Sequence, residues 1–126
     1  MTVTANAKLL LVEDDYLLRH AFKLLLEDRG YRIVEAGSAA EAIANAKAAS
    51  PDLVLLDLGL PDAPGLDVAR ELRKHDAFSL IPIIALTGRV GAAEKEECLK
   101  AGCTSYLTKP IEPKILIKRI SEFLED

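Results

Sequence analysis

The sequence lacks several features that would assign it to a membrane, redox or secreted class. No apolar run approaches the length needed to span a bilayer, and the N-terminus has no basic, leader-like segment, so we expect a cytoplasmic protein without membrane insertion. Only two cysteines are present, Cys98 and Cys103, and their spacing fits neither a CxxC redox motif nor a metal-ligand pair. We therefore expect two reduced thiols near the end of a helix.

The sequence also lacks an excess of basic residues and any linker-like tract. The 126 residues include 16 Lys and Arg against 20 Asp and Glu, and no basic stripe suited to nucleic acid is present, so we expect no direct nucleic-acid binding. No repeat, low-complexity tract or Pro/Gly/Ser linker divides the chain. Half of the residues are hydrophobic, which indicates one globular domain over residues 1–126. We also expect an intact small protein with no output domain.

Five short apolar runs alternate with five helical patterns, which is typical of parallel βαβ units. The predicted strands are Lys8–Val12, Tyr31–Ala36, Asp52–Asp57, Ile81–Leu86 and Thr104–Leu107. The predicted helices are Asp15–Arg29, Ser38–Ala49, Gly65–His75, Ala92–Ala101 and Glu112–Leu124. The alternation predicts an α/β fold with an open, doubly wound parallel sheet covered by helices on both faces. The second strand alternates in polarity, which suits an edge position.

Acidic residues follow two of the most apolar predicted strands. Glu13-Asp14-Asp15 comes directly after one strand, and Asp57 ends another. Taken alone, the first cluster could simply begin a helix, where acids are favoured. Parallel strands that end side by side would instead bring Asp57 next to Asp14, and clustered carboxylates of this kind are held together by a cation, usually Mg²⁺.

Two further strand ends place a hydroxyl and an ammonium group at the same edge of the sheet. Thr87 comes directly after the fourth predicted strand, and Lys109 comes two residues after the fifth. A divalent ion could bridge Asp14, Asp57 and a phosphoryl oxygen, while Lys109 and Thr87 bind the other phosphoryl oxygens. Asp57 would then be the nucleophile that forms an acyl phosphate.

Four segments of the chain resemble the receiver domain of two-component response regulators across nearly its whole length. They are "LLLVEDDYLLR", "PDLVLLDLGLPDAPGLDVARELR", "IPIIALTG" and "AGCTSYLTKPI". The resemblance implies a flavodoxin-like, five-stranded sheet of order 2-1-3-4-5 with five helices. It also implies a stand-alone, chemotaxis-regulator-like response regulator of a two-component or phosphorelay system.

The resemblance implies a role for each matching residue. Asp57 would be the phosphoacceptor that becomes 4-aspartylphosphate. The expected Mg²⁺ ligands are Glu13, Asp14, Asp57 and the backbone carbonyl of Gly59. The residues expected to bind the phosphoryl group or to switch with it are Thr87, Gly88, Tyr106 and Lys109. Pro110 would follow a cis peptide bond, whereas Asp15 is assigned to helix capping.

The chain departs from the commonest family pattern at three positions. Gly59 has no side chain to screen an acyl phosphate from water, and Arg89 follows Gly88, so the lifetime of the phosphate is open. Pro64 replaces an aspartate that often precedes the glycine at the start of the third helix.

The resemblance also implies partners. The phosphoryl group would come from a sensor histidine kinase or a histidine phosphotransfer protein, and the chain would not be a turnover enzyme on a small substrate. Output would pass by protein–protein contact to an unknown target, through the face of the fourth helix, fifth strand and fifth helix that carries Tyr106 and Ile115. The chain would be a monomer or a phosphorylation-dependent dimer.

The first helix has more leucine than a core contact needs, so we expect Leu17 or Leu24 to help dock the phosphodonor.

Three other functions are open to a chain with this pattern. A haloacid-dehalogenase-like phosphatase needs a second acid two residues after its nucleophile, where this chain has Gly59. A flavin-binding flavodoxin-like module needs a hydroxyl- and glycine-rich loop after the first strand, where this chain has acids that repel phosphate. A degenerate receiver that works unphosphorylated would not need the set of Glu13, Asp14, Asp57, Thr87 and Lys109.

Overall fold

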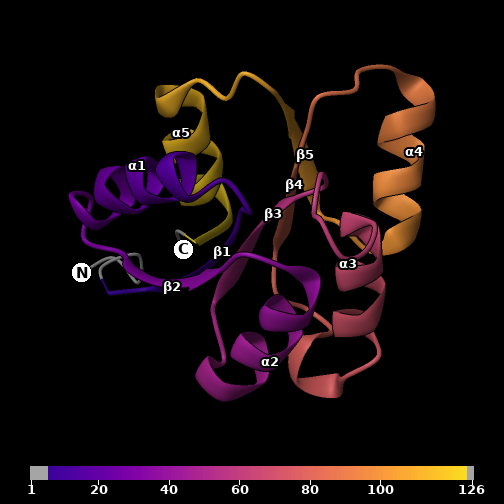
Figure 1. Ribbon diagram of the computed structural model, residues 1–126, viewed down its shortest axis with the longest axis horizontal. Coiled ribbons are helices and arrows are strands. Elements are labelled where there is room, and N and C mark those ends of the chain that lie inside the picture. Colours follow the sequence, from indigo (N-terminus) through magenta and orange to yellow (C-terminus); the bar gives the residue numbers. More distant parts are fainter. Residues whose placement is uncertain (1–5, 125–126) are drawn as a thin grey trace.

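Five parallel strands form one sheet in the order β2-β1-β3-β4-β5 in the computed structural model, which describes residues 6–124 (Figure 1). The strands are β1 (Lys8–Val12), β2 (Arg32–Ala36), β3 (Leu53–Asp57), β4 (Ile83–Thr87) and β5 (Ser105–Thr108). The helices are α1 (Tyr16–Glu27), α2 (Ala39–Ala49), α3 (Gly65–Arg73), the short 3₁₀ helix η1 (Asp76–Phe78), α4 (Ala92–Ala101) and α5 (Pro113–Leu124). The predicted topology is confirmed, and β2 lies at the edge as expected.

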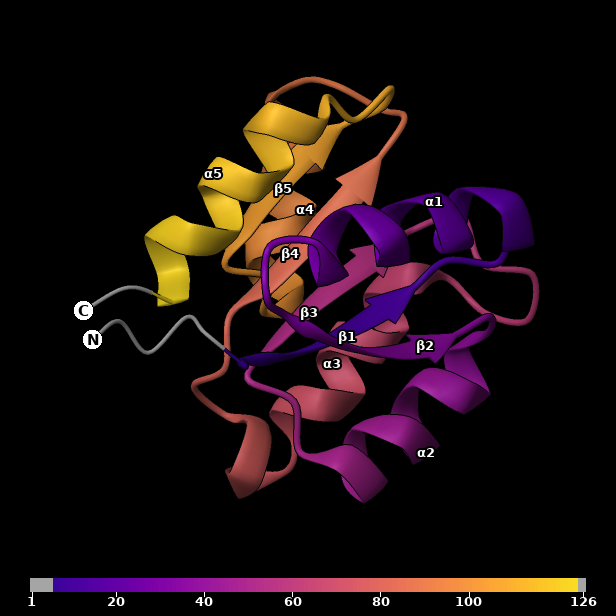
Figure 2. The same ribbon diagram turned by 90° about the vertical axis from the view of Figure 1, so that its left-hand side faces the viewer.

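Helices cover both faces of the sheet. Helices α1 and α5 lie on one face, and α2, α3 and α4 lie on the other (Figures 1 and 2). Alternate residues of the strands point to opposite faces, so the core divides into two clusters. Leu10, Val54 and Ile83 pack against α2 to α4, whereas Leu9, Leu55 and Ile84 pack against α1 and α5. All residues of β3 and β4 are buried, which accounts for their continuous apolar sequences.

Several predicted boundaries differ from those of the structure. Strand β3 begins at Leu53 rather than Asp52, and the Asp52 side chain accepts a hydrogen bond from the Lys8 amide. Strand β4 begins two residues later than predicted, since Pro82 has no N–H to donate to a neighbouring strand. The 3₁₀ helix η1 was not predicted. The N-terminal residues 1–5, in which no leader-like pattern was found, lie outside the described residues.

Side chains cap the first two helices. The Asp15 carboxylate accepts from the Leu17 and Leu18 amides at 3.0 and 3.2 Å, which confirms Asp15 as the N-cap of α1. The Ser38 hydroxyl accepts from the Glu41 amide at 3.2 Å at the start of α2. The reciprocal bond of the capping box differs from the usual one, because the Glu41 carboxylate accepts from the amide of Gly37 instead of Ser38.

The loop between β3 and α3 is held at two points. Helix α3 begins so close to the end of β3 that a Cβ atom on Gly65 would lie 2.4 Å from the Leu58 Cα and 2.8 Å from the Asp57 carbonyl oxygen. The Asp62 carboxylate accepts from the Ala39 and Ala40 amides, at 2.8 and 3.1 Å, and so ties this loop to α2. These contacts fix the backbone that follows Asp57.

The two cysteines and the lengths of the helices can be compared with the predictions from the sequence. Cys98 lies in α4 and Cys103 just after it, and both are free, buried thiols, as predicted. Burial raises the pKa of the Cys103 thiol to about 12, so this thiol stays protonated at neutral pH. Among residues 6–124, no helix combines the length and the apolar character needed to cross a membrane.

Candidate phosphoacceptor and metal site

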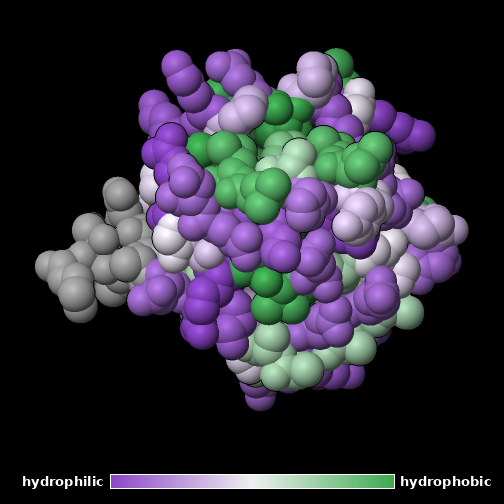
Figure 3. All heavy atoms as spheres, turned by 60° about the vertical axis from the view of Figure 1, so that its left-hand side comes forward, coloured by the Kyte–Doolittle hydropathy of each residue, from purple (hydrophilic) through white to green (hydrophobic). Residues whose placement is uncertain are grey.

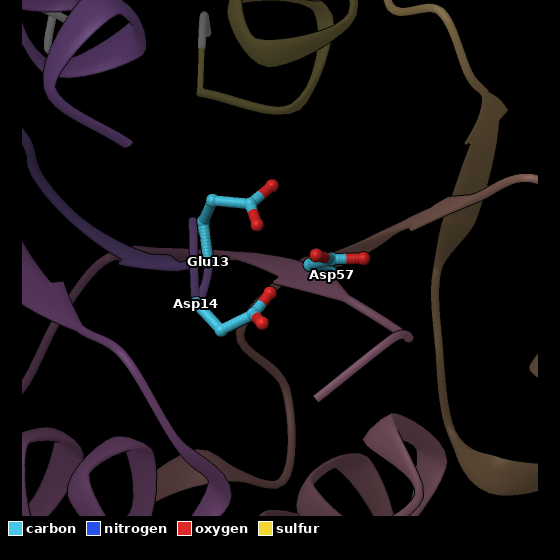
Figure 4. Close-up of side chains that lie close together, drawn as sticks. All are labelled: Glu13, Asp14 and Asp57. Carbon is cyan, nitrogen blue, oxygen red and sulfur yellow. The ribbon is translucent and has the colours of Figure 1, made fainter. Parts of the chain in front are cut away.

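Three carboxylates meet at the carboxyl ends of β1 and β3. Val12 pairs with Leu56 in the parallel register, so Glu13 and Asp57 follow side by side. Each of Glu13, Asp14 and Asp57 offers an oxygen that lies within 4.8 Å of the other two. Figure 4 shows the three side chains around one shared space. The structure thus brings together the three acids that the sequence predicted to meet.

Asp57 is almost fully buried and its position is fixed by two donors. Its side chain is 2% exposed. Its Oδ1 atom accepts from the Lys109 Nζ at 2.7 Å and from the Gly59 amide at 3.0 Å. Burial favours the neutral form of Asp57, but these two hydrogen bonds, the positive charge of Lys109 and the neighbouring Glu13 together outweigh it and lower the pKa of the carboxyl. Asp57 is therefore ionised at neutral pH, as a nucleophile requires.

The pKa of Glu13 is shifted in the opposite direction from that of Asp57. Burial, together with the neighbouring Asp57, raises the pKa of Glu13 to about 7. Its Oε2 atom accepts from the Asp15 amide at 3.1 Å, whereas its buried Oε1 atom has no hydrogen-bond partner among the described residues. A buried acidic oxygen without a donor is costly in a protein alone, and it suits a site that holds a hard cation.

Thr87 and Lys109 flank Asp57 on the β4 and β5 side. A cavity of about 520 Å³ opens beside these groups, and its lining includes Asp57, Gly59, Thr87, Arg89, Glu94 and Lys109. Gly59 and Gly88 are exposed, and a Cβ atom on Gly88 would meet nothing within 4 Å. The Lys109-Pro110 peptide bond is cis, as predicted.

Tyr106 lies apart from this cavity. It is half-buried on β5 and lines a groove of about 650 Å³, whose other walls include Leu99 of α4 and Ile115 of α5. Tyr106 and Ile115 therefore share one surface, as expected, and Ile115 is exposed there.

Sequence reasoning missed two residues that support the site. Arg19 of α1 donates to the Glu13 carbonyl oxygen at 2.7 Å and pairs with Glu35 of β2 at 3.1 Å, so it anchors the loop that carries the acids. Glu94 of α4 accepts a hydrogen bond from the Thr87 hydroxyl at 3.2 Å. Arg19 ends the segment "LLLVEDDYLLR", but nothing in that segment indicates that its guanidinium would contact the Glu13 carbonyl, and Glu94 lies outside all four family-like segments.

The first helix exposes much of its apolar side chain surface beside the acidic site. Leu17 is 77% exposed and Leu24 is 54% exposed, which confirms that part of the excess leucine lies outside the core. Figure 3 shows hydrophobic side chains gathered on this face of the molecule. A largely apolar cavity of about 330 Å³ adjoins α1, and its lining includes Leu18, Phe22, Pro110 and Ile111 as well as Glu13 and Lys109.

Comparison with known proteins agrees with this geometry. Residues 9–121 match the family described as "Response regulator receiver domain". The transcriptional regulatory protein PhoP of Escherichia coli (strain K12) is 37% identical over 117 residues, which cover 93% of this chain and 52% of PhoP. The virulence transcriptional regulatory protein PhoP of Salmonella typhi is also 37% identical, with 93% and 51% covered. The chain thus spans about half the length of these curated relatives.

Solved structures are similar over almost the entire chain. The chemotaxis protein CheY4 of Vibrio cholerae superimposes with a TM-score of 0.90 at 31% identity, covering 95% of this chain and 100% of CheY4. The receiver domain of the sensor histidine kinase PA1611 from Pseudomonas aeruginosa PAO1 gives a TM-score of 0.86 at 31% identity, covering 95% and 98%. That structure has a magnesium ion coordinated in its active site cleft.

Proposed function

The chain belongs to the response regulator receiver domain family, and from this we propose that it accepts a phosphoryl group on Asp57 in a two-component or phosphorelay signalling system. The observation that carries the proposal is the contact between Asp57 and Lys109, 52 residues apart in the sequence, beside the acids of the β1–α1 loop. A buried, ionised carboxylate held by an ammonium group is suited to attack phosphorus.

The proposal includes a Mg²⁺ ion in the acidic cluster. The residues that would hold it are Glu13, Asp14, Asp57 and the backbone carbonyl of Gly59. The unpartnered Oε1 atom of buried Glu13 supports this assignment, as does the oxygen-only donor set that Mg²⁺ prefers. When bound, the ion would offset the negative charge of the carboxylates and of the transferred group.

In the proposed reaction, a carboxylate oxygen of Asp57 attacks the phosphorus of a phosphohistidine on the partner. The new O–P bond forms as the N–P bond breaks, and the electron pair of that bond stays on the imidazole nitrogen of the partner. Lys109, 2.7 Å from Asp57 Oδ1, supplies positive charge next to the transferred oxygens. The product is a 4-aspartylphosphate, and the chain is a phosphoacceptor rather than a turnover enzyme on a small substrate.

Two surfaces are assigned to partners in the proposal. The exposed leucines of α1, with the apolar cavity beside Pro110, would dock a sensor histidine kinase or a histidine phosphotransfer protein. The groove that Tyr106 and Ile115 share would contact a downstream protein after phosphorylation shifts the conformation. The proposal places the chain in the cytoplasm, as a monomer or as a dimer that forms on phosphorylation.

Acetyl phosphate with Mg²⁺ tests the proposal without any partner protein. Intact mass spectrometry should detect one added phosphoryl group on the wild-type chain, and none on Asp57→Asn or in the presence of EDTA. The Asp52→Asn variant is the matched control, because Asp52 is exposed at the opposite end of β3 and should leave phosphorylation unchanged. Equal phosphorylation of the wild type and Asp57→Asn would refute the proposal.

A further inference from the structure

The hydroxyl group of Thr87 already has partners for its proton and for a lone pair. It donates to the Glu94 carboxylate at 3.2 Å and accepts from the Arg89 amide at 3.1 Å. A hydroxyl carries one proton and can make one such donation at a time. Thr87 therefore cannot donate to a phosphoryl oxygen on Asp57 while it donates to Glu94.

Glu94 lies close enough to Asp57 and Thr87 to compete with a phosphoryl group for the Thr87 proton. It is the third residue of α4, and it lines the same cavity as Asp57, Thr87 and Lys109. A glutamate at this position of a helix commonly bonds back to the amide of the N-cap residue. Here the N-cap is Gly91, which makes no side-chain cap, and the bond found for the Glu94 carboxylate goes to Thr87 instead. The carboxylate thus links the start of α4 to the end of β4.

We infer that Glu94 is a positioning residue that holds the Thr87 hydroxyl toward α4 and so opposes the phosphorylated conformation. The inference rests on the proposed function, because it requires a phosphoryl group on Asp57 that competes for the same proton. The bond to Glu94 must break before Thr87 can bind that group, so the free energy of the bond is subtracted from the free energy that drives the switch. Removal of Glu94 should favour the phosphorylated conformation, as a population shift predicts.

The test is the affinity for beryllofluoride, a tetrahedral mimic of the phosphoryl group, measured at saturating Mg²⁺ by isothermal titration calorimetry. The Glu94→Ala variant loses the hydrogen bond between Thr87 and a charged carboxylate. It should therefore bind beryllofluoride about tenfold more tightly than the wild type. Glu97→Ala is the matched control, since Glu97 lines the same cavity on the same helix, carries the same charge and has no hydrogen bond to Thr87 within residues 6–124. It should change the affinity less than about twofold, because exposed charges interact weakly.

A second background separates the Thr87 contact from any general effect of charge or helix stability. In Thr87→Val, which keeps the shape and removes the hydroxyl, Glu94→Ala should no longer tighten binding. Thermal unfolding by circular dichroism shows whether Glu94→Ala is folded, and Glu94→Gln, which keeps the side-chain volume, should shift the affinity in the same direction.

Two results would overturn the inference while leaving the proposed function intact. One is an equal effect of Glu94→Ala and Glu97→Ala on beryllofluoride affinity, and the other is an undiminished effect of Glu94→Ala in the Thr87→Val background. A wild-type chain that binds no beryllofluoride and gains no phosphoryl group from acetyl phosphate would instead refute the proposed function, and the inference with it.

Discussion

Glu13 should destabilise the metal-free protein at neutral pH, and its replacement by glutamine should relieve that cost. The carboxyl is buried, and its pKa is raised from 4.5 to about 7 by burial and by the nearby Asp57. Each pKa unit corresponds to about 1.4 kcal/mol, so ionising Glu13 in the folded state costs on the order of 3 kcal/mol of stability above pH 7. Glutamine keeps the acceptor for the Asp15 amide and carries no charge.

The pH dependence follows from the direction of this shift. Because the folded-state pKa of Glu13 lies above its unfolded value, folding favours the protonated form of this carboxyl. The contribution of Glu13 to the free energy of unfolding is fully present below about pH 4.5 and is lost as the pH rises to about 7. Asp57 has the opposite sign: its pKa is lowered from 3.8, so its contribution is lost only as pH falls below that value. The window between pH 5 and pH 8 therefore reports mainly on Glu13.

Urea unfolding followed by far-UV circular dichroism measures this effect in the presence of EDTA. Glu13→Gln should be more stable than the wild type by about 3 kcal/mol at pH 8, with a much smaller difference at pH 5. Asp14→Asn is the control at the same cluster, and it should gain less because Asp14 is exposed. Saturating Mg²⁺ should stabilise the wild type more than Glu13→Gln. A difference between wild type and Glu13→Gln that does not depend on pH would refute the reasoning.

Three other substitutions test the support of the site and its docking surface. Gly65→Ala places a Cβ atom 2.4 Å from the Leu58 Cα, so it should lower stability by about 1–3 kcal/mol and slow phosphorylation by acetyl phosphate; an unchanged unfolding midpoint would contradict the close approach. Asp62→Ala removes both bonds to the start of α2 and should lower the melting temperature more than Asp67→Ala, which breaks only an exposed pair within α3. Leu17→Glu should slow phosphotransfer from a partner kinase but leave the rate with acetyl phosphate unchanged, whereas equal slowing of both would point to damaged folding.

Much of the fold and the carboxylate cluster could be predicted from the sequence. Strands buried on both faces are continuously apolar, so the amino-acid sequence alone is enough to identify β3 and β4 as strands. Acids at the ends of parallel strands must lie at one edge of the sheet, and this placed Glu13, Asp14 and Asp57 together. The strand order itself came from the resemblance to a family, because several orders are compatible with alternating strands and helices.

The contacts that hold the site could not be predicted in the same way. Arg19 donates to the carbonyl of Glu13, and this bond depends on where α1 packs rather than on any repeat in the sequence. Glu94 follows Thr87 by seven residues across an irregular loop, so neither helical nor strand periodicity relates the two side chains. Asp62 caps a helix that begins 23 residues before it, which local capping patterns cannot indicate. Tertiary packing alone sets these pairs.

The central claim is that Asp57 captures the phosphoryl group, and the most direct measurement is to locate the modified residue. Borohydride reduction converts an aspartyl phosphate to homoserine, which tandem mass spectrometry can assign to one position after treatment with acetyl phosphate and Mg²⁺. The account predicts homoserine at position 57 and at no other carboxylate of the cluster. Reduction at Asp14 instead, or a phosphoryl group retained on a histidine, would contradict it.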